Sequence, residues 1–185
     1  MMAQSNLQHY TKPLIIIHWL TLLLFIAVYC SIEFRGLFER GTDARTWMVK
    51  SHFIFGCIIW LLVWIRLFVR RAQTAPAIIP AIPDWQHKLA GLFHLSLYGL
   101  MLAMPVLGYS IVSLEGKQVD LLLFDLPNVL SANTELAHDL EEIHELIGKL
   151  GYALIGVHAV AALFHHYMQR DNTLSRMLPR IKPRS

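Results

Sequence analysis

Residues 144–167 read HELIGKLGYALIGVHAVAALFHHY, a long apolar stretch that carries four histidines. An ionisable side chain inside a membrane is costly, and such residues usually mark functional sites. Whether these histidines meet water or lipid therefore decides what they do, and the composition of the whole chain bears on that question first.

The chain is rich in segments long enough to cross a bilayer. It is 55% hydrophobic and 16% charged, whereas soluble domains average roughly 45–50% and about 25%. Leu14–Ile32 contains 19 residues without an acid or a fixed base, and Leu89–Leu114 contains 26 interrupted only by His94. A membrane-spanning helix needs about 20 apolar residues. With Trp47–Val69 and Ile143–Met168, the sequence predicts an all-α, integral membrane four-helix bundle.

We predict one transmembrane domain over residues 1–185, with no repeat and no second domain. The first apolar run is too long for a cleaved signal, and no small-x-small site follows it. Three prolines within Ala75–Trp85 predict a stiff non-helical crossover, and Pro105 predicts a kink in the third span. A short surface helix is expected ahead of the fourth span. The predicted spans are approximately 14–34, 47–69, 89–113 and 142–168.

Charges in the connecting segments predict the orientation, because basic residues concentrate on the cytoplasmic side. Bases gather in the N-terminal tail, the second connection and the C-terminal tail, whereas most acids lie in the first and third connections. Both termini are therefore expected in the cytoplasm. The sequence pI near 9.0 then reflects membrane anchoring, and no nucleic-acid binding is expected. The bases are Lys12, Arg66, Arg70, Arg71, Lys88, Arg170, Arg176, Arg180, Lys182 and Arg184.

The histidine spacing predicts two sites at different depths. His144 and His158 are 14 residues apart, so they lie about 40° apart around a helix and about 21 Å apart along it. With both termini inside, His18 falls in the inner half of the first span and His52 in the outer half of the second. The natural pairs are His52 with His144 outside, and His18 with His158 inside.

Two bis-histidine sites stacked across a four-helix bundle are typical of a transmembrane di-haem cytochrome. Gly56 and Gly148 each follow a candidate ligand by four residues, which removes bulk where a flat porphyrin would press, and Gly151 lies between the two sites. The chain has no Cys-x-x-Cys-His, so two non-covalent b-type haems are expected. Its two cysteines, Cys30 and Cys57, are interpreted as thiols within spans, and a disulfide between them would require their Cα atoms to approach to roughly 4.4–6.8 Å.

The alternatives are interhelical hydrogen bonding and a histidine proton path, as in a transporter. For one lone histidine either would be favoured, whereas two depth-matched pairs favour haem. A zinc or copper site is disfavoured because neither pair has a third ligand of suitable type nearby.

The chain resembles the prokaryotic cytochrome b561 family, and within it the superoxide:ubiquinone oxidoreductase (superoxide oxidase) branch. The resemblance implies haem ligands at the four paired histidines and a place in the bacterial inner membrane. It also implies electron transfer from periplasmic superoxide to ubiquinone within the membrane. The motifs that carry it are IHWL (17–20), YCSIEFRGLF (29–38), SHFIFG (51–56), FHLSLYGLMLAMPVLG (93–108), HELIGKLGYALIGVHAVAALFHHY (144–167) and DNTLSRMLPR (171–180).

Substrate contacts follow from charge and depth. Arg35 and Lys50 are the preferred bases for steering superoxide outside, ahead of Arg40, Arg45 and Lys117. Lys149 either pairs with an outer haem propionate or extends to the membrane surface.

The inner end carries the candidates for ubiquinone. His94 lies at inner depth, and His165 follows His158 by seven residues, about 20° away around the helix. The resemblance places its quinone site around these two histidines, and Trp85 is a candidate pocket wall. The competing interpretation is a non-enzymatic cytochrome subunit that relays electrons for a dehydrogenase or hydrogenase. Short connections and a short C-terminal tail favour action without an obligate protein partner.

Overall fold

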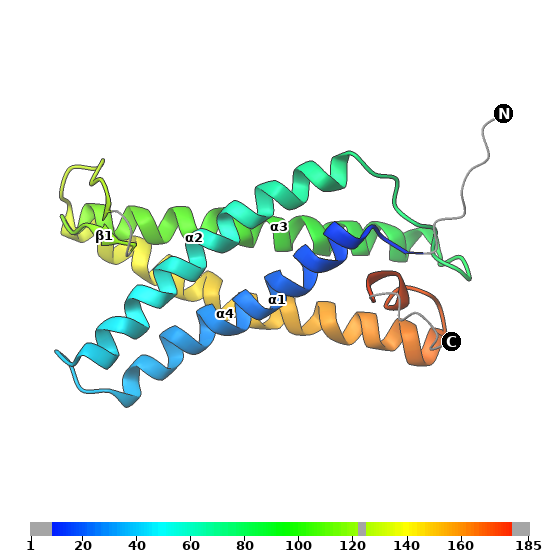
Figure 1. Ribbon diagram of the computed structural model, residues 1–185, viewed down its shortest axis with the longest axis horizontal. Helices are drawn as coiled ribbons and strands as arrows, with labels where there is room; N and C mark the ends of the chain where they lie inside the picture. The colour runs from blue at the N-terminus through cyan, green and yellow to red at the C-terminus, as the bar shows by residue number, and fades with distance from the viewer. Residues whose placement is uncertain (1–8, 122–124, 179–185) are drawn as a thin grey trace.

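The computed structural model describes residues 9–121 and 125–178. Four long helices dominate it, and each is long and apolar enough to cross a membrane. This confirms the predicted all-α, four-helix class. The helices, shown in Figure 1, are α1 (Lys12–Glu33), α2 (Asp43–Arg71), α3 (Asp84–Leu114) and α4 (Thr134–Phe164).

Side-chain caps fix where two of the helices begin. The Thr42 hydroxyl accepts a hydrogen bond from the backbone N–H of Arg45 at the start of α2. The Asn133 side chain does the same for Leu136 at the start of α4 (3.0 Å). These caps satisfy backbone donors that a helix N-terminus leaves unpaired. Because the cap lies at Asn133, the predicted surface helix and the fourth span are one continuous helix, and α3 likewise runs unbroken through Pro105.

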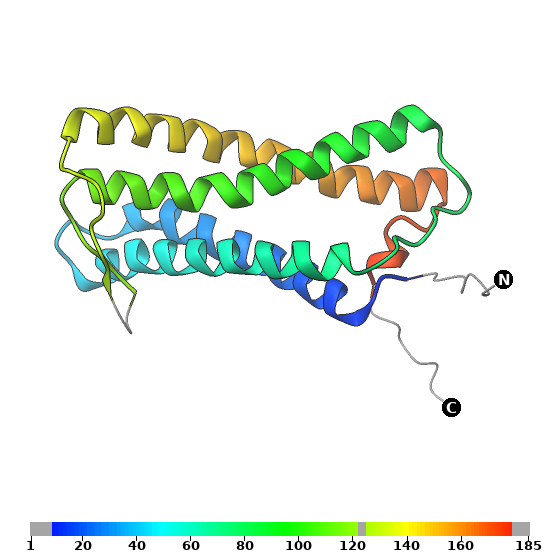
Figure 2. The ribbon, with the colours of Figure 1, turned by 90° about the horizontal axis from the view of Figure 1, so that it is seen from above.

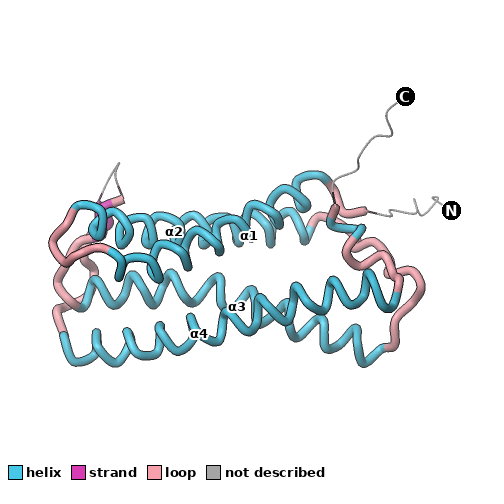
Figure 3. Tube along the Cα trace, turned by 90° about the horizontal axis from the view of Figure 1, so that it is seen from below, coloured by secondary structure: helices cyan, strands magenta, loops and turns pink. Residues whose placement is uncertain are grey.

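The helices form two antiparallel hairpins that lie in separate layers (Figure 2). α1 packs mainly on α2, and α3 packs mainly on α4, whereas the backbones of α1 and α4 approach each other far less. Figure 3 shows the same two layers from the opposite side. Any residues that bridge α4 to α1 or α2 therefore reach across the space between the hairpins.

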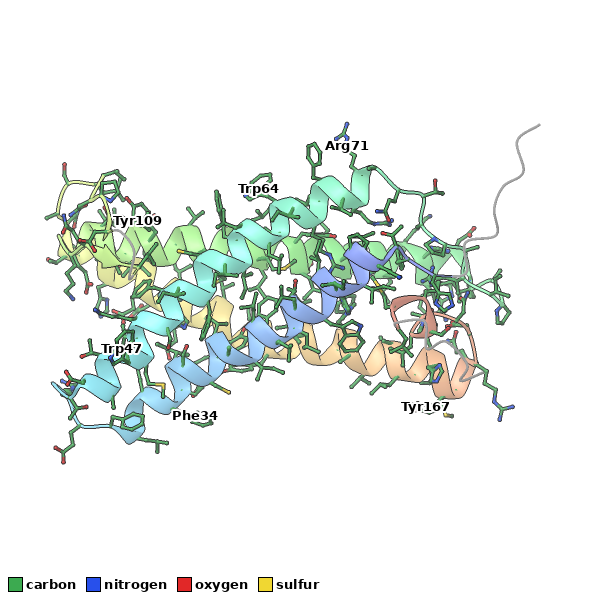
Figure 4. All side chains as sticks on the ribbon, in the orientation of Figure 1. Phe34, Trp47, Trp64, Arg71, Tyr109 and Tyr167 are labelled. Atoms are coloured by element: carbon green, nitrogen blue, oxygen red, sulfur yellow. The ribbon has the colours of Figure 1, made fainter. Side chains whose placement is uncertain are left out.

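The buried core of the bundle is small, as expected for a protein whose outer surface meets lipid. Leu24, Ile59, Val63 and Met101 form its central cluster. Large aromatic side chains remain on the outside: Trp47, Trp64 and Tyr167 are 54%, 51% and 68% exposed and project from the periphery of the bundle in Figure 4. Cys30 and Cys57 are free thiols.

Short elements close the two ends of the bundle. A 3-10 turn, η1 (Phe34–Leu37), follows α1, and strands β1 (Val119–Asp120) and β2 (Asp125–Leu126) pair antiparallel between α3 and α4. A π-helical turn, η2 (His165–Gln169), and a 3-10 turn, η3 (Ser175–Met177), follow α4.

Both ends of the described chain meet at one end of the bundle, where the N–H of Tyr10 donates to the carbonyl of Arg176 (3.0 Å). This agrees with termini on one side of the membrane. Which side that is remains a prediction.

Candidate functional site

The structure brings the four paired histidines together as two couples at different depths. His52 of α2 and His144 of α4 have ring centroids 6.3 Å apart. His18 of α1 and His158 of α4 have ring centroids 6.2 Å apart. In each couple α4 supplies one ring and the α1–α2 hairpin supplies the other, so both couples bridge the space between the hairpins.

The spacing of the rings suits a metal ion held between them. An imidazole nitrogen lies about 2.0–2.1 Å from the metal that it ligates. Adding a ring radius of roughly 1.1 Å on each side places two axial imidazoles about 6.3 Å apart, centroid to centroid. Both couples match this separation, as the bis-histidine arrangement of a b-type haem requires.

We call the His52–His144 couple the outer couple and the His18–His158 couple the inner couple, after the predicted orientation. At the outer couple, the ring nitrogens are arranged as ligands need. Nδ1 of His52 lies 3.0 Å from the carbonyl of Val28. Because a carbonyl only accepts, this nitrogen donates, and Nε2 is left with a free lone pair. Such a bond also fixes the ring's orientation, as second-shell partners of metal-bound histidines do. In His144, the buried Nδ1 atom has no hydrogen-bond partner among the residues that the structure describes.

A cavity of about 410 Å³ opens beside the outer couple and is lined from all four long helices. This volume lies within the roughly 300–1,000 Å³ typical of cofactor pockets. Gly56 and Gly148 both line the cavity. The space beside Gly56 is open: a Cβ atom built on it would meet no heavy atom of another described segment within 4 Å. The outer site therefore fits a flat cofactor between His52 and His144.

Two further glycines, Gly151 and Gly108, lie at close contacts between helices. Gly151 is buried against Leu100 and the Tyr29 hydroxyl, which a Cβ at this position would strike. Its small size therefore makes room for Tyr29, which donates to the carbonyl of Gly148 (2.9 Å). Gly108 of α3 lies directly beside His144, and sequence spacing gave no reason to select it, because it lies on a different helix from the ligand that it touches.

Replacing Gly108 should disturb the outer site selectively. A Cβ at this position would lie 3.4 Å from Cε1 of His144, so the bulkier Gly108→Leu must displace the ring. We expect the outer haem to be lost from most molecules while the inner one is kept, measured as haem per protein. Gly99→Leu is the matched control, since a Cβ there meets nothing within 4 Å. Equal haem contents in the two variants would contradict the expectation.

The inner couple has the same ring spacing but a different neighbour. Nη1 of Arg66 lies 3.2 Å from Nδ1 of His18, and Nε of Arg66 donates to the Tyr98 hydroxyl (3.1 Å). A guanidinium only donates, so in this arrangement Nε2 of a neutral His18 ring carries the hydrogen. Ligation through Nε2 requires Arg66 to release this contact. The freed guanidinium is then available for an anionic group such as a haem carboxylate.

His94 lies close to the inner couple, with its ring centroid 5.5 Å from that of His158. This distance is about 0.8 Å shorter than the separation of about 6.3 Å estimated above for axial imidazoles. The geometry therefore favours His18 over His94 as the partner of His158. It leaves His94 as a neighbour of the inner site.

His165 lies in η2, where its Nδ1 atom is 2.5 Å from Oδ2 of Asp171. The sequence did not suggest this partner. Six residues at 100° per residue place position 171 about 240° around an ideal helix from His165. The π-helical turn and the left-handed backbone of Arg170 (φ 55°) bring the carboxylate back to the ring.

The outer bases occupy different environments. Arg35 is exposed and lines the cavity beside His52, and the ammonium of Lys50 lies 5.6 Å from the centre of the Trp47 ring. Arg45 instead holds η1 in place, donating to the carbonyls of Arg35 and Phe38 (both 3.1 Å). Lys117 is paired with Glu115 (2.9 Å).

Lys149 also lines the outer cavity, and its ammonium forms an exposed ion pair with Glu145 (2.6 Å). In the protein without a cofactor, the Lys149 side chain therefore extends to the surface, the second of the two predicted arrangements. Trp85, the candidate wall of a quinone pocket, is 62% exposed.

Comparisons with known proteins agree over nearly the whole chain. Residues 9–180 match the family model described as prokaryotic cytochrome b561. The chain is 39% identical over 176 residues to cytochrome b561 homolog 1 of Escherichia coli (strain K12), covering 95% of this chain and 100% of the relative. It is 37% identical over 164 residues to the probable superoxide oxidase CybB of Yersinia pestis, covering 89% and 92%. Identity to cytochrome b561 homolog 2 of E. coli is 28% over 171 residues, covering 87% and 86%.

Proposed function

Because the chain belongs to the prokaryotic cytochrome b561 family, we propose that it is a di-haem membrane cytochrome that passes electrons from periplasmic superoxide to ubiquinone. The single observation that carries the proposal is the pair of histidine couples, with ring centroids 6.2 and 6.3 Å apart. The choice of superoxide as the electron donor is supported by one relative, which is named a probable superoxide oxidase. In this proposal the bacterial inner membrane holds the protein with both termini inside.

The four histidines have a common role in this proposal. His52 and His144 hold the outer haem, and His18 and His158 hold the inner one. When bound, the haems supply reversible one-electron transfer. With two histidines holding each haem, neither iron would offer an open position to oxygen, which favours outer-sphere electron transfer.

The overall reaction balances as two superoxide anions and one ubiquinone with two protons, giving two dioxygen molecules and one ubiquinol. Each superoxide gives up one electron and needs no proton. The quinone takes up two electrons and two protons. The outer end of the protein therefore has to attract a small anion, whereas the inner end has to donate hydrogen bonds and protons.

At the outer end, Arg35 and Lys50 are proposed to steer superoxide towards the cavity. Electrostatic steering raises association rates by about 10–10³-fold and weakens with salt, because the Debye length is about 8 Å at physiological ionic strength. Lys149 is proposed to hold an outer haem carboxylate once it releases Glu145. Arg66 is proposed to hold a carboxylate of the inner haem in the same way.

The steering proposal predicts a salt-dependent reaction. Arg35→Glu and Lys50→Glu are each expected to slow reduction of the haems by superoxide by about tenfold at low salt, since each reverses a charge on the approach path. Stopped-flow haem absorbance at increasing salt measures the effect. Arg71→Glu, the same charge change at the opposite end of α2, should leave the rate unchanged. A wild-type rate that does not fall as salt rises would contradict steering.

Anaerobic titration of the purified protein tests the whole proposal. Superoxide should reduce both haems, and short-chain ubiquinone should re-oxidise them, each followed by haem absorbance. Reduction by quinol with no response to superoxide would instead favour the electron-relay subunit. A purified protein without haem would contradict both.

A further inference from the structure

The inner end of the bundle is closed by a segment that we call the C-terminal cap, residues 170–178. The cap is fixed by bonds to distant parts of the chain. Asn172 binds Ile79 through both backbone and side chain (3.0 and 2.8 Å), and Arg176 donates to the carbonyl of Pro76 (2.5 Å). The indole of Trp19 donates to the carbonyl of Met177 (2.7 Å). These bonds hold the cap in one position against Trp19, whose ring centroid lies 5.5 Å from that of His18.

Within the cap, Asp171 is the carboxylate that faces His165. The side chain of Asp171 is 0% exposed, whereas that of His165 is 17% exposed. Oδ2 of Asp171 binds Nδ1 of His165 (2.5 Å), and Oδ1 accepts the backbone N–H of Thr173 (2.7 Å). Both carboxylate oxygens are therefore occupied by donors, as an ionised carboxylate requires when it is buried.

The backbone also determines where Asp171 points. Its N–H donates to the carbonyl of His165 (3.1 Å), and Arg170 adopts the left-handed conformation that ends the helix. Non-glycine residues rarely adopt this conformation, and π-helical turns such as η2 often occur at functional sites. The turn that precedes the cap thus places the carboxylate and the imidazole in one hydrogen bond.

We propose that Asp171 is a positioning residue that holds His165 by Nδ1–H and stabilises its protonated form, so that Nε2–H delivers a proton to a quinone carbonyl oxygen. This rests on the proposed quinone reduction. The step breaks the N–H bond at Nε2 and forms an O–H bond on the quinone as it takes up electrons. The imidazole becomes neutral, keeps its Nδ1–H on Asp171, and regains a proton from water.

The physical basis is the coupling of tautomer and charge. A neutral histidine that donates from Nδ1 has only a lone pair at Nε2, which cannot donate to a carbonyl. The imidazolium that carries a second proton at Nε2 is stabilised by the buried carboxylate, whose Oδ2 atom lies 2.5 Å from Nδ1. Burial raises the pKa of Asp171, but the hydrogen bonds from His165 and Thr173 outweigh this, so its pKa lies below its usual value. Asp171 thus stays ionised while the imidazole gives up its proton.

Other charged groups also surround the dyad. Arg176 lies near Asp171, and burial lowers the pKa of its guanidinium while Tyr10 and Asp171 oppose this effect. Arg70 and Arg176 both lie against the Tyr10 ring, at 5.4 and 5.7 Å from its centre. The positive charge of Arg176 favours the ionised carboxylate of Asp171 as well. None of them bonds to the imidazole in the way that Asp171 does.

The experiment starts from protein whose haems have been reduced chemically, so it does not depend on superoxide. Mixing with short-chain ubiquinone then gives the rate of haem re-oxidation across a range of pH. We expect Asp171→Asn to slow this rate by about 10–100-fold, the usual cost of losing a partner that orients a functional histidine. The wild-type rate should fall as pH rises, because the step consumes protons, and Asp171→Asn should be slower than wild type at every pH.

A double variant separates positioning from folding. If Asp171 acts through His165, then Asp171→Asn should have no additional effect in a His165→Ala background. Asp139→Asn, an exposed acid at the other end of α4, should behave as wild type. An unchanged rate in Asp171→Asn across the pH range would overturn the proposal, and so would loss of haem from that variant. Wild-type haems that quinone re-oxidises but superoxide does not reduce would overturn the proposed donor alone.

Discussion

Replacing His144 with alanine is expected to leave one haem per protein instead of two. His144 and His52 face each other across the outer cavity with ring centroids 6.3 Å apart, so one side of the site loses its ligand. The remaining imidazole then holds a haem through a single bond. Because the inner couple lies about 21 Å along α4, its haem should remain with a low-spin spectrum.

The haem content is measured after purification as pyridine haemochromogen per protein. His52→Ala should give the same result. In both variants superoxide should reduce the remaining haem more slowly than it reduces the wild-type haems, since the outer haem that receives the electron is gone. His138→Ala is the control, because His138 is an exposed residue of the same helix. Among the described residues its one ion-pair partner is Glu142. Two haems in His144→Ala would contradict the pairing.

The second large effect is expected at the inner end, where His165→Ala should slow haem re-oxidation by ubiquinone by about 10²–10⁴-fold, the usual contribution of a general acid. Both haems should be retained with unchanged spectra, because His18 and His158, the proposed ligands of the inner iron, are untouched. Reduction by superoxide should also be unaffected. Stopped-flow absorbance of chemically reduced protein mixed with quinone provides the measurement.

His94→Ala provides the companion test of the inner site. Its ring lies 5.5 Å from that of His158, nearer than the separation that axial ligation needs, so the variant should also keep both haems and react slowly with quinone. A missing haem would make His94 a ligand and require the pairs to be redrawn. Wild-type quinone kinetics in both variants would leave these histidines as hydrogen-bonding partners only.

The fold was largely predictable because the bilayer imposes long apolar runs that composition reveals directly. Depth was predictable for the same reason: His18 and His158 meet because antiparallel spans place them at one level. What the sequence left out was decided by backbone detail. The start of α4 at Thr134 depends on a cap at Asn133, which an apolar run starting near residue 142 does not reveal.

Neighbours from different helices were also hidden from sequence. Gly108 was missed because its role depends on how α3 packs against α4, and helical spacing reports only positions on one helix. Asp171 was missed because ideal periodicity directs it away from His165, and only η2 reverses that. The ion pair between Lys149 and Glu145 could have been found, since residues four apart are neighbours on any helix.

The two hairpins described above have a consequence for biogenesis. Each histidine couple joins α4 to the other hairpin, while the backbones of α1 and α4 scarcely meet. If the haems bind there, cofactor insertion adds two links between the hairpins, which otherwise meet through the small core in which Met101 of α3 packs on the α1–α2 hairpin. Cells starved of haem should then accumulate a loosened apoprotein that membrane proteases degrade, so its abundance would follow haem supply even at constant transcription.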